Sequence, residues 1–322
     1  MLVDRASPGD SSVPDRGERG MTDRRSFAKA ALAVSSMCSF LMFCPMARAL
    51  AQNDKAASDA LSTALRNIEA ERGGRLGVAV LDSQTGKSAG YRADERFPMC
   101  STFKLLAAAA VLSRIDRGDD RLDRRIRFAA SDVVVNSPVT QNRSAPESMT
   151  LAEICEAAMT YSDNTAGNLM LTSIGGPKAL TAYARSLGDT VTRLDRTEPE
   201  LNEALPDDPR DTTSPAAMLS NLRDLVTGNA LQRESRDRLS GWLIGNKTGG
   251  SRLRAGLPRE WRVGDKTGAG ERGTTNDVAV VWPSEGSRPL FISIYLTGDR
   301  IDGKHQNATI ASVGAALARW RG

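Results

Sequence analysis

The sequence predicts an α/β fold in which one sheet is built from both ends of the chain and a helical segment is inserted between them. Strand-like alternation of apolar residues is found in residues 75–97 and again only after Arg259, whereas residues 98–244 show helical spacing with polar loops. Helical periodicity also precedes the first strands and follows the last one. The simplest arrangement covers the sheet with the terminal helices and gives the inserted helices a second lobe.

Each element has its own local signal. Residues 53–72 predict a helix that stops at Gly73-Gly74, and residues 75–97 predict two strands around the turn "QTGK". Three more strands are expected at residues 261–268, 276–283 and 289–298, followed by a helix at 307–322. The insertion contains six helical stretches, at residues 101–115, 151–162, 164–174, 177–187, 214–226 and 234–244.

Residues 1–51 are interpreted as an export signal that is cleaved, not as part of the fold. The segment has a basic start, an apolar run and small residues at its end, with cleavage expected after Ala49 or Ala51. The pair Arg24-Arg25 resembles a twin-arginine signal, which is read by a receptor; an ordinary secretory signal is the alternative. We therefore expect a periplasmic or secreted bacterial protein. No later stretch reaches the roughly 18 apolar residues of a membrane span.

Composition excludes several classes of function. The net charge of +4 is mild, and no basic stripe with interleaved aromatic residues is present, so we expect no nucleic-acid partner. The one histidine, His305, and the absence of a Cys-x-x-Cys pair argue against a metal site and against a zinc hydrolase. His305 lies in a polar loop without an orienting partner, which also argues against a Ser-His-Asp triad.

The stretch "MCSTFKLL" places Ser101 and Lys104 three residues apart before an apolar run. In a helix this spacing brings both side chains to one face. A serine hydroxyl is a weak nucleophile and needs a base beside it, so the pair is a candidate for nucleophilic catalysis. The alternative is a helix-capping serine with a surface lysine, because serine is a favoured cap.

Two further short stretches have the same double interpretation. "YSDN" supplies Ser162 and Asn164 at the start of a helix, where such residues also act as caps. "DKTGAG" supplies Lys266 to Ala269 at the end of a strand, where an amide group can face a carbonyl oxygen. The similar "NKTGG" at 246–250 is interpreted as an ordinary helix end, because lysine and glycine are common there.

A loop of about sixteen residues follows Arg196 and contains "RTEPELN". Such a loop is usually a solvated connection, but loops longer than about 12–15 residues in compact domains are usually functional. Arg196 and Asp211 are expected to close this one as an ion pair.

Taken in order, Ser-x-x-Lys, Ser-Asp-Asn, Glu-x-x-Leu-Asn and Lys-Thr-Gly resemble the class A serine β-lactamases over roughly residues 55–320. The resemblance implies a five-stranded antiparallel sheet in an α/β lobe (residues 52–97 and 246–322) and an all-helical lobe (residues 98–245). It implies hydrolysis of penicillin- and cephalosporin-type antibiotics through an acyl-serine, giving antibiotic resistance. It also implies a monomer that uses no cofactor and no metal.

The resemblance assigns roles to matching residues. Ser101 is the nucleophile, its N–H and that of Ala269 form the oxyanion hole, and Lys104 lies between Ser101 and Ser162, which passes a proton to the leaving nitrogen. Either Lys104, its pKa lowered by the neighbouring Lys266, or Glu198 acting through water is the base for acylation.

Other roles concern hydrolysis and binding. Glu198, in a cis peptide bond to Pro199, and Asn202 hold the water that hydrolyses the acyl-enzyme. Lys266, Thr267 and Gly268 bind the substrate carboxylate, and Asn164 binds the side-chain amide.

This chain departs from the common family pattern at three places. Thr275 stands where many members have a carboxylate-binding arginine, and we expect Arg252, rather than Arg272, to replace it. Asn136 stands where an aromatic residue often lies. Cys100 and Cys155 lack the usual partners, so no disulfide is expected.

The alternatives are a penicillin-binding D,D-peptidase and a sensor domain that is acylated without turnover. Both share Ser-x-x-Lys and Lys-Thr-Gly, but neither is expected to have the Glu198 loop.

Overall fold

The computed structural model describes residues 45–143, 148–298 and 302–321. The chain divides into two compact units, residues 1–53 and 54–322. The described part of the first unit is the beginning of helix α2 (Pro45–Arg72). The second unit contains all the residues that the sequence singles out for catalysis and binding.

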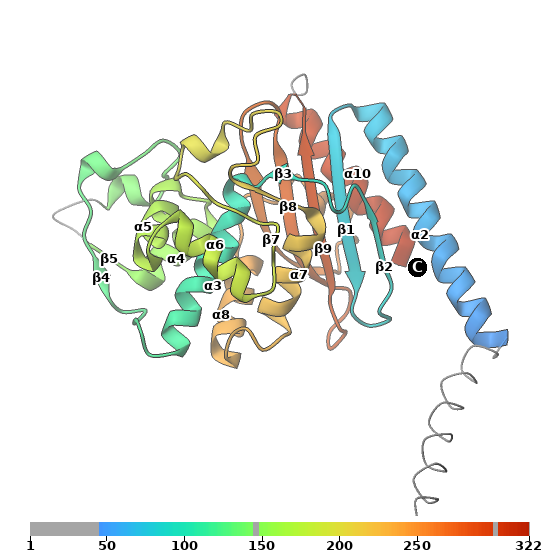
Figure 1. Cartoon of the computed structure of the whole chain (residues 1–322), viewed down its shortest axis with the longest axis horizontal. Helices are drawn as coiled ribbons and strands as arrows, with labels where there is room; N and C mark the ends of the chain where they lie inside the picture. Colours follow the sequence, from blue (N-terminus) through green and yellow to red (C-terminus); the bar gives the residue numbers. More distant parts are fainter. Residues whose placement is uncertain (1–44, 144–147, 299–301, 322) are drawn as a thin grey trace, which may run out of the picture. The chain divides into compact units, whose positions relative to one another are not determined.

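A five-stranded antiparallel sheet runs through this second unit, as the sequence predicts (Figure 1). Its order is β2-β1-β9-β8-β7, so the first strands of the chain pair with the last one. The strands are β1 (Arg75–Asp82), β2 (Ser88–Tyr91), β7 (Arg262–Ala269), β8 (Thr275–Trp282) and β9 (Leu290–Thr297).

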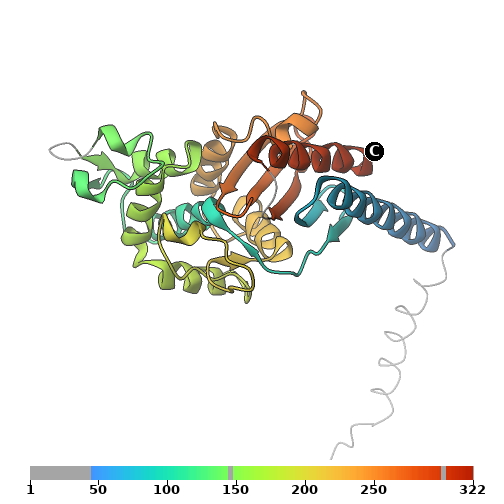
Figure 2. The same cartoon turned by 90° about the horizontal axis from the view of Figure 1, so that it is seen from above.

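Helices cover both faces of the sheet (Figures 1 and 2). One face carries the part of α2 that belongs to the second unit (residues 54–72) and α10 (Gly303–Arg321), and the helices of the insertion lie on the other side of the sheet. These are α3 (Phe103–Asp116), α4 (Leu151–Thr160), α5 (Asn164–Ile174), α6 (Pro177–Ser186), α7 (Pro215–Val226) and α8 (Arg233–Ile244), with the short α9 (Leu253–Gly256) following them. Helix α7 contacts β1, β8 and β9 directly. The division into lobes at residues 98 and 245 stays a prediction.

Strand β9 shows why the sheet is covered on both sides. Phe291 and Tyr295 pack into the core shared with the inserted helices, whereas Ile292 and Ile294 pack into the core under α2 and α10. Side chains alternate between the two faces of a strand, so a strand with large apolar residues on both faces requires two cores. Each such side chain stabilises the fold by about 1.5–3 kcal/mol.

The structure corrects the start of the first helix, which the sequence analysis placed at residue 53. Helix α2 begins at Pro45, because proline suits the first helical turn and residues 46–51 are mostly good helix formers. The helix ends at Arg72 as expected, and Gly73 (φ 77°) and Gly74 (φ 80°) take the left-handed conformation.

Two short strand pairs were not predicted. One joins β4 (Arg125–Ile126) to β5 (Met149–Thr150). The other joins β3 (Phe97–Pro98), just before Ser101, to β6 (Thr212–Thr213), which ends the long loop. Strands of two residues have no periodicity that a sequence could reveal. The second pair fixes the loop beside the candidate nucleophile.

Candidate active site

Ser101 lies in a single turn of 3₁₀-helix, η1 (Cys100–Thr102), directly before α3. Its hydroxyl does not cap the helix. It accepts a hydrogen bond from Lys104 Nζ (2.8 Å) and donates one to Glu198 Oε1 (3.1 Å). The capping interpretation is therefore wrong for Ser101, and Lys104, which is fully buried, is not a surface lysine.

Lys104 is surrounded by oxygen atoms. Its Nζ also donates to the Ser162 carbonyl (2.7 Å) and to Asn164 Oδ1 (2.8 Å), and lies 2.9 Å from Glu198 Oε1. Burial lowers the pKa of Lys104, and the Glu198 carboxylate opposes this shift. The ammonium group thus links the nucleophile to three other parts of the site.

Lys266 is the second buried lysine, on β7. Its Nζ donates to Ser162 Oγ (3.0 Å) and to the Thr267 carbonyl (2.9 Å). Its pKa is well below the usual range, first because of burial and second because of the charge of Lys104. The repulsion between the two buried ammonium groups disfavours the charged form of both, and the pKa of Lys104 is lowered as well.

The Ser-Asp-Asn stretch serves the fold and the site at once. Asp163 caps α5, accepting a hydrogen bond from Ala166 N (2.8 Å), which confirms the structural interpretation for that residue. Ser162 has φ 58°, and this left-handed turn places it beside Lys266. The amide of Asn164 bridges Lys104 and the Val135 carbonyl (3.0 Å).

Glu198 is brought to Ser101 by the long loop. As predicted, Arg196 and Asp211 close that loop as an ion pair at 2.6 Å, and Asp211 is buried. The Glu198-Pro199 peptide bond is cis, as the resemblance implied. Glu198 Oε2 accepts a hydrogen bond from Asn202 Nδ2.

The end of β7 passes very close to the residues before the nucleophile. A Cβ at Gly268 would lie 2.8 Å from the Met99 carbonyl, so a side chain there would push the strand away. The next residue, Ala269, lines the same cleft as Ser101. Glycine is therefore required for the close approach of strand and nucleophile.

Most of the predicted residues meet in one cleft of about 630 Å³. Seven of them line it, namely Ser101, Ser162, Asn164, Asn202, Arg252, Thr267 and Ala269. The other four, Lys104, Glu198, Lys266 and Gly268, are each hydrogen-bonded to a lining residue. The structure thus brings all eleven together.

Arg252 reaches the cleft from the segment before α9. It donates to the carbonyls of Gly268 and Asn276 (both 2.8 Å) and to Asn307 Oδ1 (2.9 Å). Thr275 is turned to Gln306 Oε1 (2.6 Å) instead. Among the described residues, Arg252 is therefore the arginine that lines this cleft.

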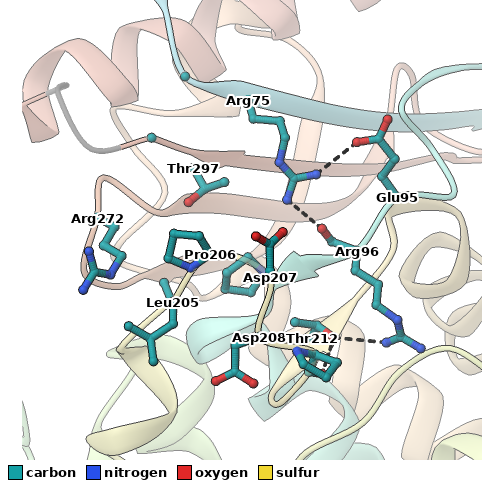
Figure 3. A pocket seen from close by; sticks show the side chains of 15 residues that line it. Arg75, Glu95, Arg96, Leu205, Pro206, Asp207, Asp208, Thr212, Arg272 and Thr297 are labelled. Carbon is teal, nitrogen blue, oxygen red and sulfur yellow. Dashed lines mark hydrogen bonds and ion pairs between the residues drawn. The ribbon is translucent and has the colours of Figure 1, made fainter.

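Arg272 lines a different and larger cavity, of about 800 Å³ (Figure 3). Arg75 lies in the same cavity and donates to Glu95 and to the Arg96 carbonyl. None of the eleven predicted site residues lines it. Choosing the candidate active site by cavity volume alone would therefore have selected the wrong cavity.

Sequence reasoning missed two residues of the site. Asn168 forms hydrogen bonds with both the N–H and the carbonyl of Glu198. It lies one turn after Asn164 on α5, so helical spacing could have indicated that it is close to the site. Thr248 belongs to the "NKTGG" stretch, which was interpreted as a helix end. That stretch does follow the end of α8, but Thr248 lines the cleft and contacts the Thr267 hydroxyl.

The cysteines and the possible metal ligands among the described residues indicate no further chemistry at the site. Cys100 and Cys155 are buried free cysteines, and burial raises the pKa of both thiols, that of Cys155 to about 12. Among the described residues, no group of three or more His, Cys, Asp or Glu side chains is placed to hold a metal ion.

Comparisons with known proteins relate this chain to β-lactamases. The model of the β-lactamase enzyme family matches residues 60–320. The chain is 49% identical to β-lactamase OXY-1 of Klebsiella oxytoca over 80% of its own length and 88% of that protein. It is 44% identical to β-lactamase L2 of Stenotrophomonas maltophilia over 94% of its own length and 100% of that protein.

Solved structures show the same relationship. An ancestral class A β-lactamase (GNCA) superposes with a TM-score of 0.79 at 59% identity, covering 80% of this chain and 99% of that one. The arrangement around Ser101 and these likenesses together show that the chain belongs to the class A β-lactamases.

Proposed function

We propose that this enzyme hydrolyses β-lactam antibiotics in two steps through an ester on Ser101, and thereby gives resistance. In the first step Ser101 Oγ attacks the lactam carbonyl, and the N–H groups of Ser101 and Ala269 stabilise the oxyanion. Both Lys104 and Glu198 lie within hydrogen-bonding distance of Ser101 Oγ, so either Lys104, in its neutral form, or Glu198 can take its proton.

Ser162 carries the hydroxyl that protonates the leaving nitrogen. Its carbonyl accepts a hydrogen bond from Lys104 Nζ, and its Oγ accepts one from Lys266 Nζ. Ser162 Oγ gives its proton to the nitrogen as the carbon–nitrogen bond breaks, and takes a proton from Lys266 Nζ in return. The second positive charge, at Lys266, also attracts the substrate carboxylate, together with Thr267 and Arg252, while Asn164 holds the side-chain amide.

The second step separates a lactamase from a penicillin-binding peptidase or an acylated sensor. Glu198, oriented by Asn202, takes a proton from water, and the resulting hydroxide attacks the Ser101 ester. The observation that carries this proposal is the buried Glu198 carboxylate, fixed at Ser101 by a loop that Arg196 and Asp211 close.

The test is a comparison of two variants by intact-protein mass spectrometry. Glu198→Ala should accumulate a penicilloyl adduct, because loss of a general base costs about 10²–10⁴-fold and Lys104 still serves acylation. Ser101→Ala should carry no adduct. A wild-type protein that stays stoichiometrically acylated for hours would favour the sensor or the peptidase.

We also propose that residues 1–51 direct export and are removed, leaving a monomer that acts in the periplasm or outside the cell without a membrane anchor. Arg24 and Arg25 lie outside the described residues. The expected cleavage sites fall inside α2, but the first deeply buried leucines of that helix, Leu61 and Leu65, lie well beyond them. Cleavage thus leaves the core-packing part of α2 in place. In the part of the chain that the structure describes, no helix is long and apolar enough to cross a membrane.

A further inference from the structure

Large apolar side chains are seldom exposed in the described part of this protein. Three stand out, Val135 (65% exposed), Tyr161 (48%) and Leu205 (37%). Of these, Tyr161 lines the catalytic cleft, and it is the one aromatic residue among the described residues that do so. An exposed aromatic ring in a polar cleft is suited to bind a flat or apolar group of a ligand.

The backbone around Tyr161 is fixed on both sides. The Thr160 carbonyl accepts a hydrogen bond from Lys247 N (2.9 Å), and Tyr161 N donates to the Ala157 carbonyl (3.1 Å). The next carbonyl, of Ser162, accepts from Lys104 Nζ. The backbone that carries the ring is therefore fixed at the cleft before any ligand arrives, so little backbone conformational entropy is lost on binding.

These contacts also determine at which end of the cleft the Tyr161 ring lies. The bond from Lys247 to Thr160 places Tyr161 beside the segment that contributes Thr248, which in turn contacts Thr267. Arg252 lines the cleft from the same segment.

The opposite end is formed by the Glu198 loop. There the carbonyl of Asn202 accepts a hydrogen bond from Glu271 N (2.9 Å), just beyond Ala269. Tyr161 is therefore on the side of the substrate carboxylate and the leaving nitrogen, away from Glu198.

We propose that Tyr161 binds the substituent of the ring that is fused to the β-lactam, and so favours cephalosporins with a flat aromatic group there. In cephalosporins this substituent and the carboxylate stand on neighbouring carbons of the sulfur-containing ring. A carboxylate held by Thr267 and Arg252 therefore directs the substituent toward Tyr161. The inference rests on the proposed function, because the proposed positions of the substrate carboxylate and of the leaving nitrogen determine where the substituent lies.

The test uses two cephalosporins with the same acylamido side chain, one with a methyl group and one with a styryl group on the sulfur-containing ring. Neither group is expelled during hydrolysis. For Tyr161→Ala, we expect the ratio of kcat/KM for the styryl over the methyl substrate to fall about three- to tenfold, mainly through KM. Tyr161→Phe keeps the ring and should keep the ratio. Leu205→Ala, which truncates an exposed apolar residue at the other cavity, is the matched control and should also keep it.

Each other outcome has a definite meaning. If wild-type protein hydrolyses neither these two substrates nor benzylpenicillin, the proposed function is wrong and this inference falls with it. If it hydrolyses benzylpenicillin alone, the function stands and the preference proposed for Tyr161 is wrong. If both cephalosporins are hydrolysed and Tyr161→Ala leaves the ratio unchanged, or lowers both rates equally, the function stands and the role of Tyr161 is wrong. A fall in the ratio for Leu205→Ala as large as that for Tyr161→Ala would also overturn it.

Discussion

Asn168 holds the peptide of Glu198 from both sides. Its Oδ1 accepts a hydrogen bond from Glu198 N (2.9 Å), and its Nδ2 donates one to the Glu198 carbonyl (2.8 Å). Because α5 carries both Asn164 and Asn168, one helix contacts Lys104 and also orients the residue proposed to activate water.

Replacing Asn168 by alanine should slow deacylation more than acylation, because Glu198 loses its orientation while Ser101 and Lys104 keep theirs. Loss of the two hydrogen bonds should also lower the free energy of unfolding by about 1–3 kcal/mol. Burst kinetics and urea denaturation measure the two effects. Thr172→Ala, one turn further along α5 and exposed, is the control. Equal slowing of both steps would contradict a role of Asn168 that is specific to deacylation.

Much of the fold could be predicted because its signals are local. The start and end of α5 follow from "SDN" and "GG", and β9 follows from an apolar run between turn residues. One sheet built from both ends of the chain could be predicted from the positions of the strands in the sequence, whereas the pairing of β1 with β9 is seen only in the structure.

The parts of the site that were missed depend on tertiary contacts. Thr248 reaches the cleft because the end of α8 lies against β7, a contact that nothing in "NKTGG" encodes. The direct hydrogen bond between Ser101 and Glu198 likewise spans 97 residues of sequence. The order of the motifs in the sequence indicated that Ser101 and Glu198 belong to one site, but only the folded structure shows which of their atoms are in contact.

Arg252 is predicted to be the arginine that supports carboxylate binding. Arg252→Ala removes a charge-assisted contact worth about 1.5–3 kcal/mol, so kcat/KM should fall about tenfold or more. Steady-state kinetics with a penicillin give the measurement. Arg272→Ala, at the other cavity, is the matched control. A large loss for Arg272→Ala with none for Arg252→Ala would mean that the wrong arginine was chosen.

The export prediction concerns the first residues of the chain. Changing Arg24 and Arg25 to lysine should leave the precursor in the cytoplasm, because a twin-arginine signal is read by its receptor and not by charge alone. Cell fractionation with an activity assay measures this. Normal periplasmic activity of that variant, or in a host without the twin-arginine translocase, would support an ordinary secretory signal.

The buried lysines predict how stability changes with pH. The pKa of Lys266 is well below 10.5 in the folded protein and returns to its usual value on unfolding. Between these two values the unfolded chain binds more protons than the folded one, so the free energy of unfolding rises with pH. The favourable contribution is complete above 10.5 and is lost as the pH falls through the lowered pKa.

Replacing Lys266 by methionine removes this titration. The difference in unfolding free energy between wild type and Lys266→Met should therefore shift in favour of wild type as the pH rises from about 7.5 to about 10. Urea denaturation at several pH values provides the curve. Lys178→Met, at an exposed position of α6, should give a curve parallel to that of wild type. If Lys266→Met and wild type also run parallel, burial does not hold the Lys266 proton more weakly in the folded state.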